Sequence, residues 1–148
     1  MKPPVVRELE VVYKRCPRSG NGILQQELTG SRAVVEAFRF LAKYPKETFL
    51  VVLLNSRHFI LGFETVAVGT ETEAQVAPSC AFRAALLSAS VGVIFIHNHP
   101  SGSSEPSAED VNLTKRLVHA GETLGIKVLD HLVIADGSHF SFAERGLL

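Results

Sequence analysis

The stretch from residue 97 to residue 110 reads HNHPSGSSEPSAED and joins the end of a strand to the start of a helix. His97 and His99 follow a short apolar run, residues 91–96, whose branched side chains are typical of a buried strand. Because strand side chains alternate between two faces, both imidazoles are predicted to point the same way. Residues 100–106 are rich in Ser, Gly and Pro, which is typical of a loop.

A helix is predicted to start near Ser107, because Ser107 and Asp110 form a Ser-x-x-acid capping pattern. Apolar residues then recur at helical spacing, at Leu113, Leu117, Ala120 and Leu124. Asp110 therefore lies in the first helical turn, where the helix dipole favours a carboxylate. A loop of this length can fold that turn over the strand end that carries the histidines.

Two neutral imidazoles and one carboxylate within fourteen residues are the ligand set of a catalytic zinc site. Such a site holds zinc with three protein ligands and leaves the fourth position for water. Each part alone has a simpler explanation, since a Ser-x-x-Asp pair is most often a helix cap and strand-end histidines often form hydrogen bonds. Together the parts favour one zinc ion per chain, bound by His97, His99 and Asp110, and therefore a hydrolase.

The spacing of His97-x-His99-Pro, six residues, Ser107, two residues and Asp110 resembles the JAMM motif of the MPN+ (JAB) metallopeptidases. The flanking segments resemble the bacterial RadC family from about residue 28 to the C-terminus. The segments that carry this likeness are 97–102, 106–107, 114–117, 129–134 and 141–146. The resemblance implies an MPN/JAB, cytidine-deaminase-like architecture and a zinc-dependent peptidase or isopeptidase. We expect a short form of the family, without the helix-hairpin-helix segment of longer members.

The JAMM pattern also includes an upstream glutamate at the start of an apolar strand. Glu47 precedes the apolar run 48–54, and the resemblance implies that it is the general base. Taken by itself, a glutamate before a buried strand is more often a solvated acid. The competing acids, which no motif match selects, are Glu64, Glu71 and Glu73. The resemblance further implies that Ser107 donates a hydrogen bond to the oxyanion, a role that competes with capping the helix.

One departure limits what the likeness carries over. Family members open the helix after the long hairpin with a His-Pro-Arg-Glu-like string, whereas residues 77–83 read APSCAFR. Substrate contacts made there are therefore not transferred to this chain. His119, His131 and His139 match no ligand position and receive no role, and His58 is expected to be a solvated turn residue.

The order of the predicted elements indicates an α/β fold of the α+β sandwich type, with a central, curved, largely antiparallel mixed sheet flanked by helices. Strands are predicted at 48–54, 58–68, 91–96, 128–134 and 140–142, with hairpins joining the first two and the last two. Glu47 and His97 are expected on neighbouring strands. One helix is predicted from Ser31, as its N-cap, to Ala42 before Pro45. Another is predicted to open at Pro78 and to bury Ala81, Phe82, Ala85, Leu86 and Ala89.

Length and composition fit one globular domain, since the chain has 148 residues and 46% apolar content. We expect an N-terminal arm at residues 1–26, with a strand near residues 9–14, and an MPN (JAMM) domain at residues 27–148. Cys16 and Cys80 fit no paired-cysteine motif and are expected to be free thiols. No signal peptide or membrane-spanning run is evident, which predicts a cytoplasmic protein.

Two alternative functions stay open at this stage. A DNA-associated role, in repair or on mobile elements, is opposed by the zero net charge, which provides no field to hold a polyanion. A non-catalytic MPN scaffold that binds a protein partner is opposed by the intact ligand set. A peptide or protein substrate is expected, nucleic acid is not supported, and an exposed edge of an antiparallel sheet would allow a homodimer.

Overall fold

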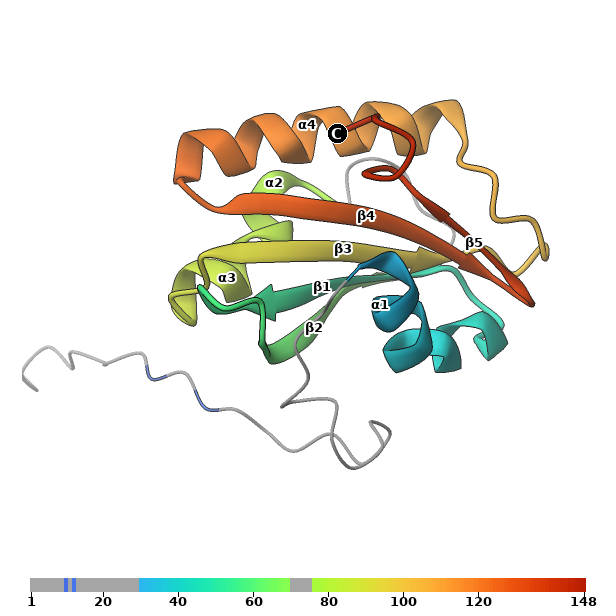
Figure 1. Cartoon of the computed structure of the whole chain (residues 1–148), viewed down its shortest axis with the longest axis horizontal. Coiled ribbons are helices and arrows are strands. Elements are labelled where there is room, and N and C mark those ends of the chain that lie inside the picture. The colour runs from blue at the N-terminus through green and yellow to red at the C-terminus, as the bar shows by residue number, and fades with distance from the viewer. Residues whose placement is uncertain (1–9, 11, 13–29, 70–75) are drawn as a thin grey trace, which may run out of the picture.

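A five-stranded mixed sheet forms the centre of the protein, with helices on both of its faces (Figure 1). The computed structural model describes residues 10, 12, 30–69 and 76–148. The predicted N-terminal arm with its strand, apart from two isolated positions, lies outside the described residues, as do Cys16, Glu71 and Glu73. Within the described part, no helix has the length and apolar character needed to cross a membrane.

The strands lie in the order β2-β1-β3-β4-β5. Their bounds are β1 Thr48–Leu54, β2 Ile60–Val68, β3 Gly92–Asn98, β4 Lys127–Ala135 and β5 Ser138–Ser141. β3 and β4 pair in parallel, and the other three pairs are antiparallel. The prediction of a curved, largely antiparallel mixed sheet of α+β type is therefore confirmed (Figure 1). Both predicted hairpins, β1–β2 and β4–β5, are also confirmed.

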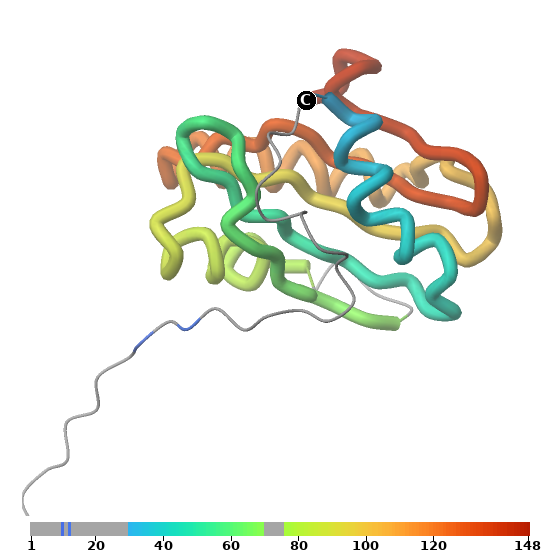
Figure 2. The backbone as a smooth tube through the Cα atoms, turned by 60° about the horizontal axis from the view of Figure 1, so that its bottom comes forward, coloured from blue at the N-terminus to red at the C-terminus, as the bar shows by residue number. Residues whose placement is uncertain are grey.

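The helices are α1 Ser31–Phe38, the 3-10 helix η2 Arg39–Lys43, α2 Pro78–Ala81, α3 Arg83–Leu87 and α4 Ala108–Leu124. α1 and η2 cover one face of the sheet, whereas α2, α3 and α4 pack on the other. Figure 2 shows α1 in front of the strands and α4 behind them. α4 also forms the crossover between β3 and β4, as a parallel pair requires.

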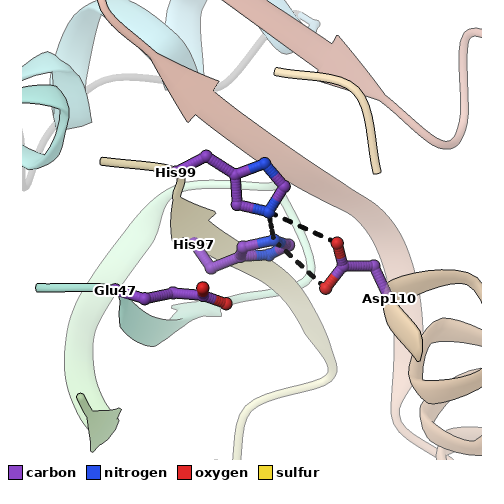
Figure 3. Close-up of side chains that lie close together, drawn as sticks. All are labelled: Glu47, His97, His99 and Asp110. Atoms are coloured by element: carbon purple, nitrogen blue, oxygen red, sulfur yellow. Dashed lines mark hydrogen bonds and ion pairs between the residues drawn. The ribbon is translucent and has the colours of Figure 1, made fainter. Parts of the chain in front are cut away.

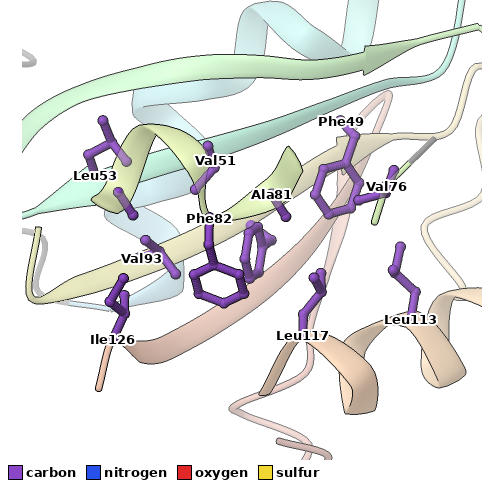
Figure 4. Packing of buried hydrophobic residues seen from close by; sticks show 12 residues of the cluster. Phe49, Val51, Leu53, Val76, Ala81, Phe82, Val93, Leu113, Leu117 and Ile126 are labelled. Atoms are coloured by element: carbon purple, nitrogen blue, oxygen red, sulfur yellow. The ribbon is translucent and has the colours of Figure 1, made fainter. Parts of the chain in front are cut away.

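The central strands β1 and β3 are buried along their whole length, because helices cover both faces of the sheet. Phe49, Val51 and Leu53 of β1 face the cluster under α2, α3 and α4, shown in Figure 4. Alternate β1 residues, from Leu50 to Leu54, face α1 and η2. This alternation continues into β3 and places His97 on the same face as α4.

Several helix predictions were wrong in detail. The helix at Pro78 is interrupted at Phe82 and forms two short helices, so Leu86 is 56% exposed and Ala89 is exposed with a positive φ of 53°. Leu124 continues the apolar spacing of α4, yet it is exposed at the end of that helix. Apolar spacing alone does not reveal how far the sheet below a helix extends.

The first helix also differs from its prediction. Its N-cap is Gly30 and not Ser31, whose hydroxyl instead donates to the Glu144 carboxylate. The α-helix ends at Phe38 and continues as η2. Strand ends differ by a few residues: β2 starts at residue 60, β3 continues through residue 98, and β5 spans residues 138–141.

Candidate metal centre

The pairing of β1 with β3 brings Glu47 and His97 together across fifty residues of sequence. His97 lies opposite Phe49 in the antiparallel register, and Glu47 precedes Phe49 by two positions, at the entry to β1. Residues two apart in an extended chain project to the same side. β1 and β3 are neighbours as predicted, but Glu47 lies one residue before β1 begins and not on the strand itself.

The start of α4 supplies Asp110 through the predicted capping box. The backbone amide of Asp110 donates to Ser107 Oγ at 3.1 Å, and the amide of Ser107 donates to Asp110 Oδ2 at 2.8 Å. This reciprocal pair fixes both the start of the helix and the direction of the carboxylate. Asp110 Oδ1 lies 3.4 Å from His97 Nε2, and Oδ2 lies 3.3 Å from His99 Nε2.

Four side chains converge at this point, as Figure 3 shows: Glu47, His97, His99 and Asp110. One ligand atom from each lies within 4.8 Å of all the others. The Nε2 atoms of His97 and His99 are 3.0 Å apart, so both imidazoles point the same way, as predicted. Ligands at ordinary zinc distances in a tetrahedron lie about 3.3 Å from each other. The separations among the two imidazoles and the Asp110 carboxylate therefore fit a zinc ion.

The charge of the cluster also suits a cation. Burial opposes ionisation of Asp110, but hydrogen bonds with His97 and then His99 outweigh burial and hold the pKa of that carboxyl well below its usual range. The hydrogen bond with Asp110 in turn raises the pKa of His99. Asp110 is therefore ionised at neutral pH and offers its charge to the imidazoles or to a metal ion.

His131 is a residue that sequence reasoning left without a role. It is completely buried in β4, and its Nε2 lies 2.9 Å from His97 Nδ1. Its Nδ1 lies 2.6 Å from the hydroxyl of Thr114, and burial lowers the pKa of its imidazole. The sequence signal that could have identified it is the pair Asp130-His131 in the middle of a largely apolar strand.

Asn98, between the two histidines, was also missed. Its side chain is buried and points away from the ligand cluster, toward the segment that leads into β1. Oδ1 accepts from the amide of Thr48 at 2.8 Å, and Nδ2 donates to the carbonyls of Tyr44 and Lys46, each at 3.2 Å. Asn98 therefore holds the residues on both sides of Glu47.

Ser107 caps the helix, as its pattern predicted, by accepting the Asp110 amide. A hydroxyl has one hydrogen to donate besides its acceptor lone pairs, so this bond leaves the O–H of Ser107 able to donate. Its function as an oxyanion donor stays a prediction.

Among the described residues, Glu64, His58, His119 and His139 lie outside the cluster. Glu64 forms an ion pair with Arg83. His58, His119 and His139 are exposed, so the expectation that His58 is a solvated turn residue is confirmed.

Comparison with known proteins agrees with this geometry. The family model described as RadC-like JAB domain matches residues 28–147. The chain is 46% identical to a UPF0758 protein of Caldanaerobacter subterraneus over 113 residues. The matched stretch covers 76% of this chain and 47% of the relative. UPF0758 proteins of Trichlorobacter lovleyi and Desulforamulus reducens are 50% and 37% identical over 103 and 137 residues. These matches cover 70% and 93% of this chain and 45% and 55% of those relatives, so the chain spans about half the length of the curated relatives it matches. The chain belongs to the RadC-like JAB domain family.

Proposed function

We propose that this chain is a zinc-dependent hydrolase of amide bonds, a metallopeptidase or isopeptidase of the JAMM type. The observation that carries the proposal is the convergence of His97, His99 and Asp110 at separations of 3.0 to 3.4 Å, with Glu47 beside them. Two imidazole ligands favour zinc over magnesium or calcium, because those harder cations prefer sites made only of oxygen.

The residues of the site take distinct roles in this proposal. When bound, zinc supplies Lewis-acid chemistry that acidifies water and polarises a scissile carbonyl. Glu47 is half-buried and lies within 4.8 Å of the three ligand atoms, so its carboxylate can accept a proton from the attacking water and pass it to the leaving amine. The O–H of Ser107, next to the carboxylate ligand, would donate to the oxyanion.

The proposed substrate is a peptide or protein. The loop at residues 99–106 borders the ligands, since His99 begins it and its Nδ1 lies 2.9 Å from the Ser103 carbonyl oxygen. This loop would therefore help to shape the substrate pocket. The proposal includes a cytoplasmic location, which suits the free thiol of Cys80, and a homodimer formed through an outer strand of the sheet.

Metal content and cleavage are measured together to test this function. We expect the purified full chain to bind one zinc ion, and His97→Ala and Asp110→Ala to lose it. Glu47→Gln should retain zinc but lose cleavage of internally quenched peptides or an isopeptide-linked probe. His119→Ala is the matched control, because that histidine is exposed on α4 and outside the cluster.

A wild-type chain that binds no zinc would overturn the whole proposal. Zinc binding without cleavage of any probe would contradict the peptidase assignment. Cleavage retained by Glu47→Gln would remove Glu47 from the mechanism.

A further inference from the structure

We propose that His131 and Thr114 are positioning residues that link two ligands of the metal centre and fix the tautomer of His97, so that its Nε2 is free to bind zinc. This inference rests on the proposed function, because it assumes that the cluster binds the metal. Neither residue contributes a ligand atom to the cluster of Glu47, His97, His99 and Asp110.

A continuous chain of hydrogen bonds runs from one ligand to the other. His97 Nδ1 lies 2.9 Å from His131 Nε2, and His131 Nδ1 lies 2.6 Å from Thr114 Oγ1. The Thr114 hydroxyl donates to the backbone carbonyl of Asp110 at 2.7 Å. These hydrogen bonds therefore join β3, β4 and α4 behind the site.

The backbone carbonyl of Asp110, at one end of this series of hydrogen bonds, determines which atom donates in each bond. A backbone carbonyl can only accept, so the single hydrogen of the Thr114 hydroxyl points to Asp110. The hydroxyl must then accept from His131 Nδ1, which carries the proton of a neutral imidazole. His131 Nε2 is left as an acceptor, and the hydrogen between the two rings belongs to His97 Nδ1.

This arrangement of donors places the His97 proton on Nδ1, as metal binding through Nε2 requires. His97 Nε2 faces the cluster, 3.0 Å from His99 Nε2 and 3.4 Å from Asp110 Oδ1. A metal ligand must offer a lone pair, so the proton of neutral His97 has to lie on Nδ1. If the hydrogen bonds ran the opposite way, His97 would carry its proton on Nε2 and could not bind zinc there.

Packing holds the ring of His131 in this orientation. It stacks on Phe142, with centroids 5.0 Å apart and an interplanar angle of 11°, and meets Phe49 at 5.4 Å and 64°. The imidazole is completely buried, and Thr114 is 1% exposed, so bulk water cannot replace either partner. Hydrogen-bonded partners of metal-binding histidines typically contribute about 10- to 100-fold to metal affinity.

The first test reads the tautomers directly, in the zinc-loaded full chain labelled with ¹⁵N-histidine. Long-range ¹H–¹⁵N spectra should show His131 protonated on Nδ1 alone and His97 protonated on Nδ1 with Nε2 bound to zinc. His131 protonated on Nε2, or on both nitrogens, would overturn the inference. A preceding zinc titration of the wild type separates the two ideas: a chain that binds no zinc overturns both, whereas bound zinc with the wrong tautomer overturns this one alone.

The second test removes one hydroxyl. Thr114→Val keeps the shape of the side chain and should weaken zinc binding about 10- to 100-fold in competition with a chromophoric chelator. Thr114→Ser retains the hydroxyl and should bind zinc like the wild type. A folded Thr114→Val chain with wild-type affinity would overturn the link, and the spectra of the wild-type chain decide the question if this variant does not fold.

Discussion

The backbone amide of Thr48 donates a 2.8 Å hydrogen bond to the side-chain oxygen of Asn98, which lies between His97 and His99 in the sequence. The end of β3 therefore both supplies His97 to the cluster and holds the segment before β1 in place. His97 projects into the ligand cluster, and Asn98, on the opposite side, holds the segment that carries Glu47. The proposed general base and the proposed metal ligands are therefore positioned by adjacent residues of a single motif.

We expect Asn98→Ala to lower the free energy of unfolding by about 2–3 kcal/mol, because it leaves buried backbone groups of the Glu47 segment without a partner. Activity should fall more than zinc affinity, since the ligands lie on the other side of the strand. Urea denaturation and zinc titration of the same preparation measure the two effects. The control is His139→Ala, an exposed position on β5. Loss of zinc from a folded Asn98→Ala chain would contradict this division of roles.

The pH dependence of zinc binding follows from His99. Its hydrogen bond with Asp110 raises its pKa above the ordinary value of 6.5. A proton on the imidazole competes with the metal, so zinc affinity should fall as pH falls through this raised pKa. Without metal, the contribution of His99 to stability changes with pH in the opposite direction. Its raised pKa stabilises the fold below pH 6.5, and this contribution is lost as pH rises through the folded-state pKa.

Thermal unfolding between pH 6 and pH 8.5, with and without zinc, tests the pH dependence of zinc binding and that of the stability of the metal-free chain. Buried His131, whose pKa is lowered, adds stability as pH rises, so the His99 contribution is the difference between the wild type and His99→Gln. Without zinc, the melting temperature of the wild type relative to that variant should decrease across this range, and the increase that zinc produces in the wild type should grow. A zinc-induced increase that is larger at pH 6 than at pH 8 would contradict the prediction.

The ligands could be predicted from sequence because their geometry is local. His97 and His99 share one strand, and the capping pattern that includes Asp110 fixes its direction within four residues of sequence. Glu47 required the family resemblance, because its place depends on the register between β1 and β3. The two hairpins and the mixed sheet followed from apolar runs and short turns, whereas the full strand order β2-β1-β3-β4-β5 was not predicted.

The residues behind the ligands could not be predicted in this way. His131 reaches His97 only because β3 and β4 pair in parallel, and apolar periodicity does not determine that register. Thr114 reads as an ordinary helix residue until α4 is placed over β4. Leu86 was wrongly predicted to be buried for a related reason, since an apolar helix position is covered only where a neighbouring element extends beneath it.

At Gly121, α4 lies close to the segment that enters β4. A Cβ added there would lie 2.5 Å from the carbonyl oxygen of Ile126 and 3.0 Å from Val128 Cγ2. We expect Gly121→Ala to destabilise the protein by about 1–3 kcal/mol, although alanine favours a helix by about 1 kcal/mol in itself.

Urea denaturation compares this variant with Asn112→Ala, an exposed position on the same helix that should be neutral or slightly stabilising. A Gly121→Ala chain as stable as the wild type would show that α4 can move away from β4 at little cost. Zinc affinity of the variant would then report whether Asp110 moves with the helix.

The Asp130 carboxylate accepts three hydrogen bonds, two of which tie β4 to the C-terminal segment. It accepts from the amide of His131 at 2.7 Å, the hydroxyl of Ser141 at 2.6 Å and the amide of Ala143 at 2.9 Å. Burial raises its pKa, so the charged form is held at neutral pH against a desolvation cost. Asp130→Ala should therefore destabilise the chain by about 2–4 kcal/mol, because it leaves buried donors unpaired.

Asp130→Asn separates the hydrogen bonds from the charge. The amide oxygen can still accept from the backbone, and its NH₂ group can donate to the Ser141 oxygen, so we expect a loss of less than about 1 kcal/mol at pH 7. The raised pKa of Asp130 also predicts how stability changes with pH. The wild type should lose stability relative to Asp130→Asn as pH rises through the folded-state pKa. Urea denaturation of both chains from pH 3.5 to pH 7 measures this difference. A relative stability that moves the opposite way would show that the three donors stabilise the carboxylate more than burial penalises it.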